Sequence, residues 1–187
     1  MSERIDAALN DCLVAGEGVK IAAWTPRQRA LVGIIPIGIS IACSVRELVR
    51  QGYIPSAKIL IRPLIERVAT SDYICDDQTA AELWNAGWPQ NKRPKLASLL
   101  SRLENGHENE WKKFQQFMVD DFNASVHPNP DGDEQYLAKN EVGESVFWLN
   151  TVPSAHELAD SVCNATAWSA VILASNAKKA FIWKGEN

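Results

Sequence analysis

The sequence has few of the residues that usually mark a metal or redox site. It contains only three histidines, and its four cysteines are far apart, with no Cys-x-x-Cys pair. Zinc sites need such ligands at short, regular spacings, so the sequence predicts neither a metal site nor a bound cofactor. The cysteines mostly fall inside apolar helical patterns, which is typical of small buried side chains in a reducing compartment.

A membrane-spanning run, a nucleotide-binding loop and an excess of basic charge are also missing. The uncharged run at residues 30–45 has 16 residues, whereas a bilayer-spanning helix needs about 20. We therefore expect a core helix there and no membrane contact. The net charge of −4 argues against broad DNA binding, and no phosphate loop, Rossmann fingerprint or nucleophile elbow is present. The N-terminal residues are not typical of a secretory signal, so we expect a cytoplasmic protein.

The hydrophobic pattern is helical along most of the chain, and no repeat or interdomain linker is visible. We predict an all-α fold, a single-domain bundle of six or seven helices formed by residues 1–187. Two helices are long: one is expected to be kinked by Pro36, and the last is rich in alanine. Residues 134–150 are predicted to be a short extended segment or a loop covering the bundle. The expected helices are 2–15, 26–50, 55–75, 77–86, 95–104, 109–126 and 153–181.

Arg62 and Glu66 lie four residues apart among apolar neighbours, which places them on one face of the predicted helix 55–75. If the pair is buried, it must be well bonded to offset its desolvation, and the planar arginine fork would suit a carboxylate or phosphate ligand. If the pair is exposed, it is an ordinary ion pair that helps to orient the helix. Both interpretations are open from the sequence.

His127 is the best single acid/base candidate in the chain. It follows Asn123 by four residues and precedes Pro128 at the predicted end of a helix. Imidazole titrates near neutral pH, which suits proton transfer, whereas a histidine that caps the last carbonyls is the structural alternative. Arg62, Glu66 and His127 are therefore the candidate catalytic or ligand-binding residues.

Two further patterns suggest contact with RNA. Arg102 and His107 have the Arg-x4-His spacing that is the signature of HEPN (higher-eukaryote and prokaryote nucleotide-binding) domains, many of which are metal-independent ribonucleases. The second pattern is the aromatic pair Trp84 and Trp88, followed by a basic loop. Aromatic rings next to cations can stack on bases and neutralise phosphates. The basic residues of this loop are Lys92, Arg93 and Lys95.

The order of motifs over residues 30–175 resembles an uncharacterised group of bacterial helical proteins that looks like a distant HEPN-type branch. The motifs are Leu48-x-x-x-Gly52-Tyr53, the Arg-Pro-Leu segment from Ala57 to Glu66, the tryptophans 84–88, and the Val-His-Pro helix end at 123–128. The resemblance implies that arginine and histidine lie on different helices, unlike the Arg-x4-His arrangement of the ribonucleases. It carries over Arg62, Glu66 and His127 as shared polar positions, and no known reaction.

Three functional hypotheses follow. The leading one is a nucleotide- or RNA-associated accessory protein acting in bacterial defence or stress. The second is a metal-independent HEPN-type ribonuclease, in which His127 is the general acid/base and Arg62 stabilises charge on the phosphate. The third is a structural or partner-binding bundle without catalysis, a homodimer joined through the apolar surfaces of helices 26–50 and 153–181. The sequence does not decide whether the chain is an enzyme.

Overall fold

The computed structural model describes residues 2–16, 24–104, 137–139, 142–143, 145–147 and 156–181. Six α-helices lie within these ranges, which confirms the predicted all-α helical bundle. Two short strands, β1 (Leu137–Lys139) and β2 (Ser145–Phe147), pair in an antiparallel hairpin. The helices are α1 (Ser2–Gly16), α2 (Pro26–Arg50), α3 (Ile54–Asp76), α4 (Gln78–Asn85), α5 (Leu96–Glu104) and α9 (His156–Phe181).

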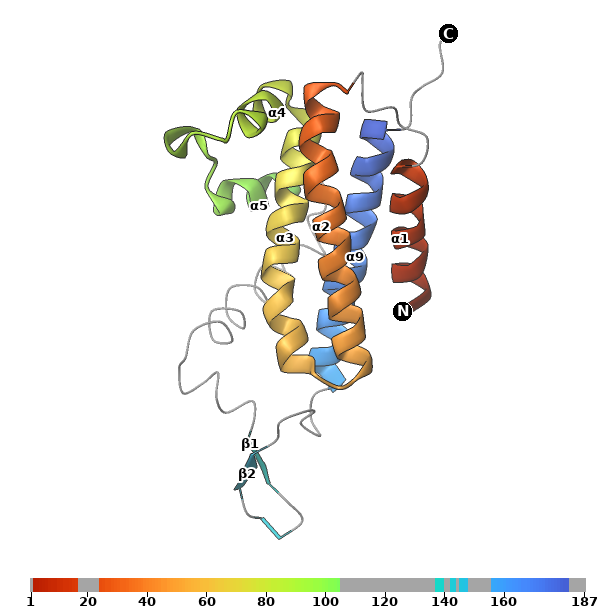
Figure 1. Cartoon of the computed structure of the whole chain (residues 1–187). Coiled ribbons are helices and arrows are strands. Elements are labelled where there is room, and N and C mark those ends of the chain that lie inside the picture. Colours follow the sequence, from red (N-terminus) through yellow and green to blue (C-terminus); the bar gives the residue numbers. More distant parts are fainter. Residues whose placement is uncertain are drawn as a thin grey trace.

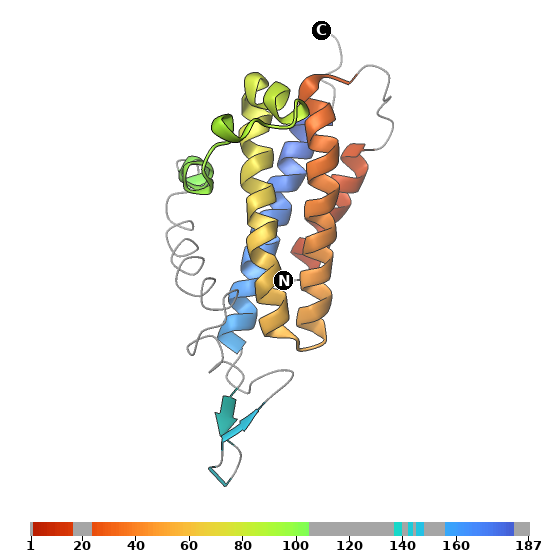
Figure 2. The same ribbon diagram turned by 60° about the vertical axis from the view of Figure 1, so that its left-hand side comes forward.

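Four long helices form the bundle. The helices α2 and α3 are antiparallel neighbours, and α9 packs against α1, α2 and α3 (Figures 1 and 2). The shorter helices are peripheral, with α4 against α2 and α3, and α5 against α3. The hairpin lies beyond one end of the bundle in both views. A loop that covers the bundle was one of the two expectations for residues 134–150, and the two strands do not form such a cover. The predicted helix 109–126 lies outside the described residues.

The start of α2 follows from local sequence. The Thr25 hydroxyl accepts a hydrogen bond from the Gln28 backbone N–H at 3.2 Å, and the Gln28 side chain accepts one from the Thr25 N–H at 3.0 Å. This reciprocal capping box, with Pro26 in the first turn, satisfies donors that a helix start leaves without partners. The Gln28 amide also donates to the Ala180 carbonyl at 2.9 Å, which ties the start of α2 to the end of α9.

The end of α2 explains one motif of the family resemblance. Gly52 has φ +82°, and its N–H donates to the Val49 carbonyl at 3.1 Å, while the Tyr53 N–H donates to the Leu48 carbonyl at 2.8 Å. These two bonds form a Schellman motif, in which glycine adopts the left-handed conformation that other residues avoid. The Leu-x-x-x-Gly-Tyr pattern therefore has a local structural role as a helix stop.

Large aliphatic side chains from the long helices fill the core. Burying each one stabilises the fold by about 1.5–3 kcal/mol relative to exposure. Gly38 allows α2 to approach α9 closely, because a Cβ at this position would lie 2.7 Å from Leu173 Cδ1. The largest fully buried side chains are Leu31, Ile34, Val45, Ile61, Leu64, Ile65, Val68, Ile74, Val162 and Leu173.

A buried polar network joins α3 to α9. The Asn176 amide donates to Ser71 Oγ at 3.0 Å, and Ser71 Oγ donates to the Val68 carbonyl at 2.8 Å. The Cys75 thiol points to the Asn176 carbonyl at 3.9 Å. Since a buried polar side chain is costly without partners, these bonds favour one relative position of the two helices.

The surface of α2 is unusually apolar for an outer helix. Among the described residues, α2 is the helix whose length and composition would allow it to cross a membrane, and 28% of its most apolar window is buried. Its exposed side includes Val32 and Ile37, at 36% and 45% exposure. The core helix of a soluble protein passes the same test, so the expected absence of membrane contact stays a prediction. Pro36 lies inside α2 without ending it.

Candidate functional site

The Arg62 and Glu66 side chains form the ion pair that their spacing predicts. Arg62 Nε lies 3.2 Å from Glu66 Oε1 on α3, and the two side chains are 39% and 41% exposed. Of the two interpretations left open by the sequence, the structure supports the solvent-accessible pair. A pair of this kind contributes only about 0.3–0.5 kcal/mol to stability. The Arg62 guanidinium is thus accessible to a ligand from solvent.

His127 and His107 both lie outside the described residues, so the predicted Arg62, Glu66 and His127 site stays a prediction. The other half of the Arg-x4-His pattern is visible, because Arg102 lies on α5. Its Nη2 is 3.2 Å from Asp76 Oδ2, and its guanidinium carbon lies 5.4 Å from the centre of the Tyr73 ring. In this fold, Arg102 therefore links α5 to the end of α3. No group of three or more His, Cys, Asp or Glu side chains among the described residues could hold a metal ion.

Three half-buried aromatic rings meet where α3, α4 and α5 come together, at the upper left of Figure 1. The rings of Tyr73 and Trp88 are stacked, with centroids 6.3 Å apart and planes 8° apart. Trp84 meets Trp88 edge to face at 5.1 Å. We define these rings, Arg102 and the three cations of the following loop as the aromatic–basic corner. Its residues are Tyr73, Trp84, Trp88, Lys92, Arg93, Lys95 and Arg102.

The backbone at the end of α4 is folded tightly to place Trp88. The Gly87 N–H donates to the Trp84 carbonyl at 3.0 Å, and the Trp88 N–H donates to the Leu83 carbonyl at 2.7 Å, a second Schellman motif. Gly87 has φ +87°, and Trp88 itself has φ +44°. A left-handed conformation in a bulky residue costs about 1–3 kcal/mol and occurs preferentially at functional sites. The stacking on Tyr73 and a hydrogen bond from Trp88 Nε1 to the Lys92 carbonyl, at 3.1 Å, offset this cost.

The loop after Trp88 makes the corner locally positive in an acidic protein. From Leu83 to Leu103 the chain has four basic residues and no acidic one. Three of them are exposed in the loop, and the fourth, Arg102, is paired with Asp76. Aromatic faces next to exposed cations match the two parts of a nucleotide, the base and the phosphate.

Sequence reasoning found only part of this corner. The two tryptophans and the basic loop are close in sequence and were predicted together. Tyr73 and Arg102 were missed as members, because they belong to other helices and reach Trp88 only in the folded chain. Residues that meet through the packing of different helices have no fixed spacing along the chain, so a single sequence does not reveal that they are neighbours.

The four cysteines are free thiols, as expected for small helical side chains. Cys12 and Cys75 are buried, and Cys43 and Cys163 are half-buried. Burial raises the pKa of the Cys12 thiol to about 11, and Asp11 acts in the same direction. Burial also raises the pKa values of Cys75 and Cys163. These three thiols are therefore uncharged at neutral pH and are poor nucleophiles.

Comparisons with models of known protein families, with curated proteins and with solved structures gave no significant match. The HEPN-like resemblance therefore stays a prediction, and the arrangement of side chains in the structure is the basis for a functional proposal.

Proposed function

We propose that this protein is an RNA-associated accessory bundle that binds single-stranded RNA at the aromatic–basic corner. The observation that carries the proposal is the stacked pair of Tyr73 and Trp88 beside a loop with three exposed cations. The left-handed Trp88 adds support, because the chain holds this ring in place at a conformational cost.

The physical case rests on two contributions. Stacking of a base on an aromatic side chain contributes about 1–3 kcal/mol and tolerates any base sequence. Each phosphate neutralised on a single strand adds about −0.7 to the slope of log affinity against log salt. Three loop cations would give a slope of about −2. A single strand is favoured over a duplex because its bases can reach the rings.

The test is binding of a fluorescent single-stranded RNA of about 12 nucleotides, followed by anisotropy between about 50 and 200 mM salt. The double variant Lys92→Gln/Arg93→Gln removes two exposed cations, so we expect weaker binding and a salt slope reduced by about 1.4. Arg50→Gln is the matched control. This exposed arginine is the last residue of α2, at the end of the bundle far from the aromatic–basic corner. Absence of binding by the wild type at low salt, or an equal effect of the control, would refute the proposal.

The same RNA tests the ribonuclease alternative. Cleavage that persists in EDTA and is lost in His127→Ala, at unchanged thermal stability, would support a metal-independent ribonuclease. Loss in His107→Ala instead would assign the chemistry to the Arg102 and His107 pattern. RNA that is bound and left intact would support the accessory role.

The apolar surface of α2 supports assembly into a homodimer. The exposed Val32 and Ile37 lie within the uncharged stretch of residues 30–45, so two copies could face each other there without repulsion between charges. Light scattering should then give twice the chain mass of 20.7 kDa. Ile37→Glu should yield monomers, whereas Ile59→Glu, at an exposed position of α3, should not. A wild-type mass near 20.7 kDa that is independent of concentration would exclude this dimer.

A further inference from the structure

The Arg62 and Glu66 pair lies on the same face of α3 as Tyr73, a member of the aromatic–basic corner. Successive residues of an α-helix are rotated by about 100°, so these three residues lie within about 40° of one another around the helix axis. All three side chains are partly exposed. Since α3 runs from the corner toward the opposite end of the bundle, one accessible face of this helix joins the corner to Arg62 (Figures 1 and 2).

The distance along this face suits a short stretch of single-stranded RNA. Tyr73 and Arg62 are 11 positions apart, and at a rise of 1.5 Å per residue the separation along the axis is about 16 Å. Phosphates of one stacked strand follow one another by about 3.4 Å along its axis, so at most about five nucleotides cover this distance. A strand with a base on the corner rings therefore extends as far as Arg62.

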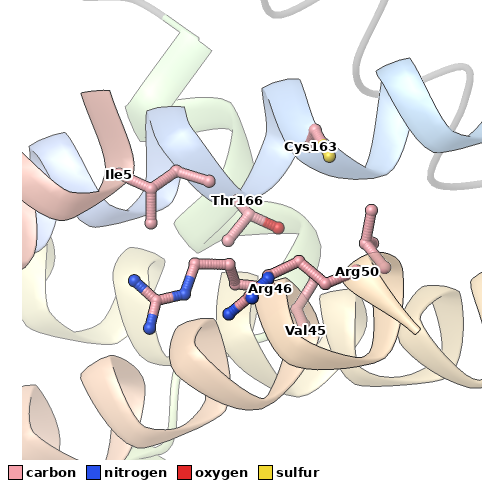
Figure 3. A pocket seen from close by; sticks show the side chains of 7 residues that line it. Ile5, Val45, Arg46, Arg50, Cys163 and Thr166 are labelled. Atoms are coloured by element: carbon pink, nitrogen blue, oxygen red, sulfur yellow. The ribbon is translucent and has the colours of Figure 1, made fainter. Parts of the chain in front are cut away.

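The Arg62 guanidinium has its two terminal nitrogens available. Its Nε donates to Glu66 Oε1 at 3.2 Å, and no described residue accepts a hydrogen bond from its Nη1 or Nη2. Arg46 and Arg50 differ, because each is paired with an acidic side chain through its terminal Nη1. These two arginines line the apolar cavity shown in Figure 3. The two terminal nitrogens of Arg62 form the end of a planar fork, which matches two oxygens of a phosphate.

Glu66 lowers the attraction of Arg62 for a phosphate without blocking the fork. The two side chains are 39% and 41% exposed, so water screens their interaction and the pair is weak. A phosphate at Nη1 and Nη2 leaves the bond from Nε to Glu66 in place. The Glu66 carboxylate still repels the phosphate as a like charge. Removing the charge of Arg62 and removing that of Glu66 should therefore have opposite effects on RNA binding.

Building on the proposed RNA-binding function, we propose that a strand stacked at the aromatic–basic corner continues along α3, and that one of its phosphates binds Nη1 and Nη2 of Arg62. The ligand is then a single strand of several nucleotides, and a mononucleotide or dinucleotide occupies only the corner.

Anisotropy of a fluorescent single-stranded RNA of about 12 nucleotides tests this path. Arg62→Gln should weaken binding about two- to fivefold and reduce the salt slope by about 0.7, because one phosphate contact is lost. Glu66→Gln should strengthen binding by a similar factor, because a repulsive charge is removed. Arg67→Gln is the matched control and should bind as the wild type does. It removes the same charge from the same helix, about 140° around the axis from Arg62.

A dinucleotide separates the two ends of the path. Adenylyl-3′,5′-adenosine can stack at the corner but is too short to reach Arg62. Ligand-observed NMR should therefore give the same affinity of this dinucleotide for the wild type and for Arg62→Gln. Circular dichroism checks that the variants are folded, which we expect because an exposed pair contributes little to stability.

Three results would overturn the proposal. They are equal effects of Arg62→Gln and Arg67→Gln on the long RNA, a Glu66→Gln variant that does not bind more tightly, and equal losses for the long RNA and the dinucleotide in Arg62→Gln. In each case, weaker binding by Lys92→Gln/Arg93→Gln would still support the corner, so failure of the path can be distinguished from failure of the proposed function. A wild-type protein that binds no RNA would refute both.

Discussion

Two glycines of α2 allow the same substitution to be tested at one open and one crowded position. A Cβ added at Gly33 would meet nothing within 4 Å, whereas a Cβ at Gly38 would lie 2.7 Å from Leu173 Cδ1 and 3.4 Å from its Cδ2. Leu173 is fully buried, so its methyl groups cannot move into solvent. Gly33→Ala should therefore stabilise the protein, and Gly38→Ala should destabilise it relative to Gly33→Ala.

The magnitudes follow from two opposing contributions. Replacing glycine by alanine inside a helix stabilises it by about 0.8–1.0 kcal/mol, which is the full expectation for Gly33→Ala. At Gly38 the same gain is opposed by overpacking against Leu173, which costs about 1–3 kcal/mol. The free energies of unfolding of the two variants should therefore differ by about 1–3 kcal/mol.

Urea unfolding followed by circular dichroism measures this difference, with equal denaturant slopes as the check that both variants unfold alike. In a Leu173→Ala background the crowding disappears, so Gly38→Ala should become stabilising, and the double-mutant cycle should show a favourable coupling. Gly38→Ala that stabilises the wild type as much as Gly33→Ala would show that α2 and α9 are not in close contact at this point.

Two further stability measurements test the described contacts. Glu66→Ala and Arg67→Ala should each lower the free energy of unfolding by less than about 0.5 kcal/mol, because the Arg62 and Glu66 pair is solvent-accessible; a loss near 3 kcal/mol in Glu66→Ala alone would indicate a buried pair. The pKa of Cys12 is raised from 9.0 to about 11 in the folded protein, so the folded state keeps a proton that the unfolded state releases above pH 9. Stability should therefore be unaffected below pH 9 and fall by up to about 3 kcal/mol as pH rises from 9 through 11. Urea unfolding at several pH values should show a smaller fall in Cys12→Ala, and identical falls in both proteins would contradict this assignment.

The sequence alone determined the helices and most of their ends. The bounds predicted for α2 agree with the structure, because Thr25, Pro26 and Gln28 act within one turn of each other and Gly52 stops the helix locally. The bounds of α3, α4 and α5 are within one residue of the prediction at each end. The spacing of Arg62 and Glu66 also predicted their ion pair. All of these features depend on residues at most five positions apart, so the information is contained in a short segment.

Only the tertiary structure decided which side chains are exposed and which helices meet. Arg62 and Glu66 have apolar neighbours in sequence, yet both are half exposed, because other helices cover a different face of α3. Tyr73 stacks on Trp88, and Asn176 donates a hydrogen bond to Ser71, although the residues of the second pair are far apart in the chain and those of the first lie on either side of α4. Burial and the charge around a site depend on the packing of several helices at once, and a local pattern in one helix does not contain that information.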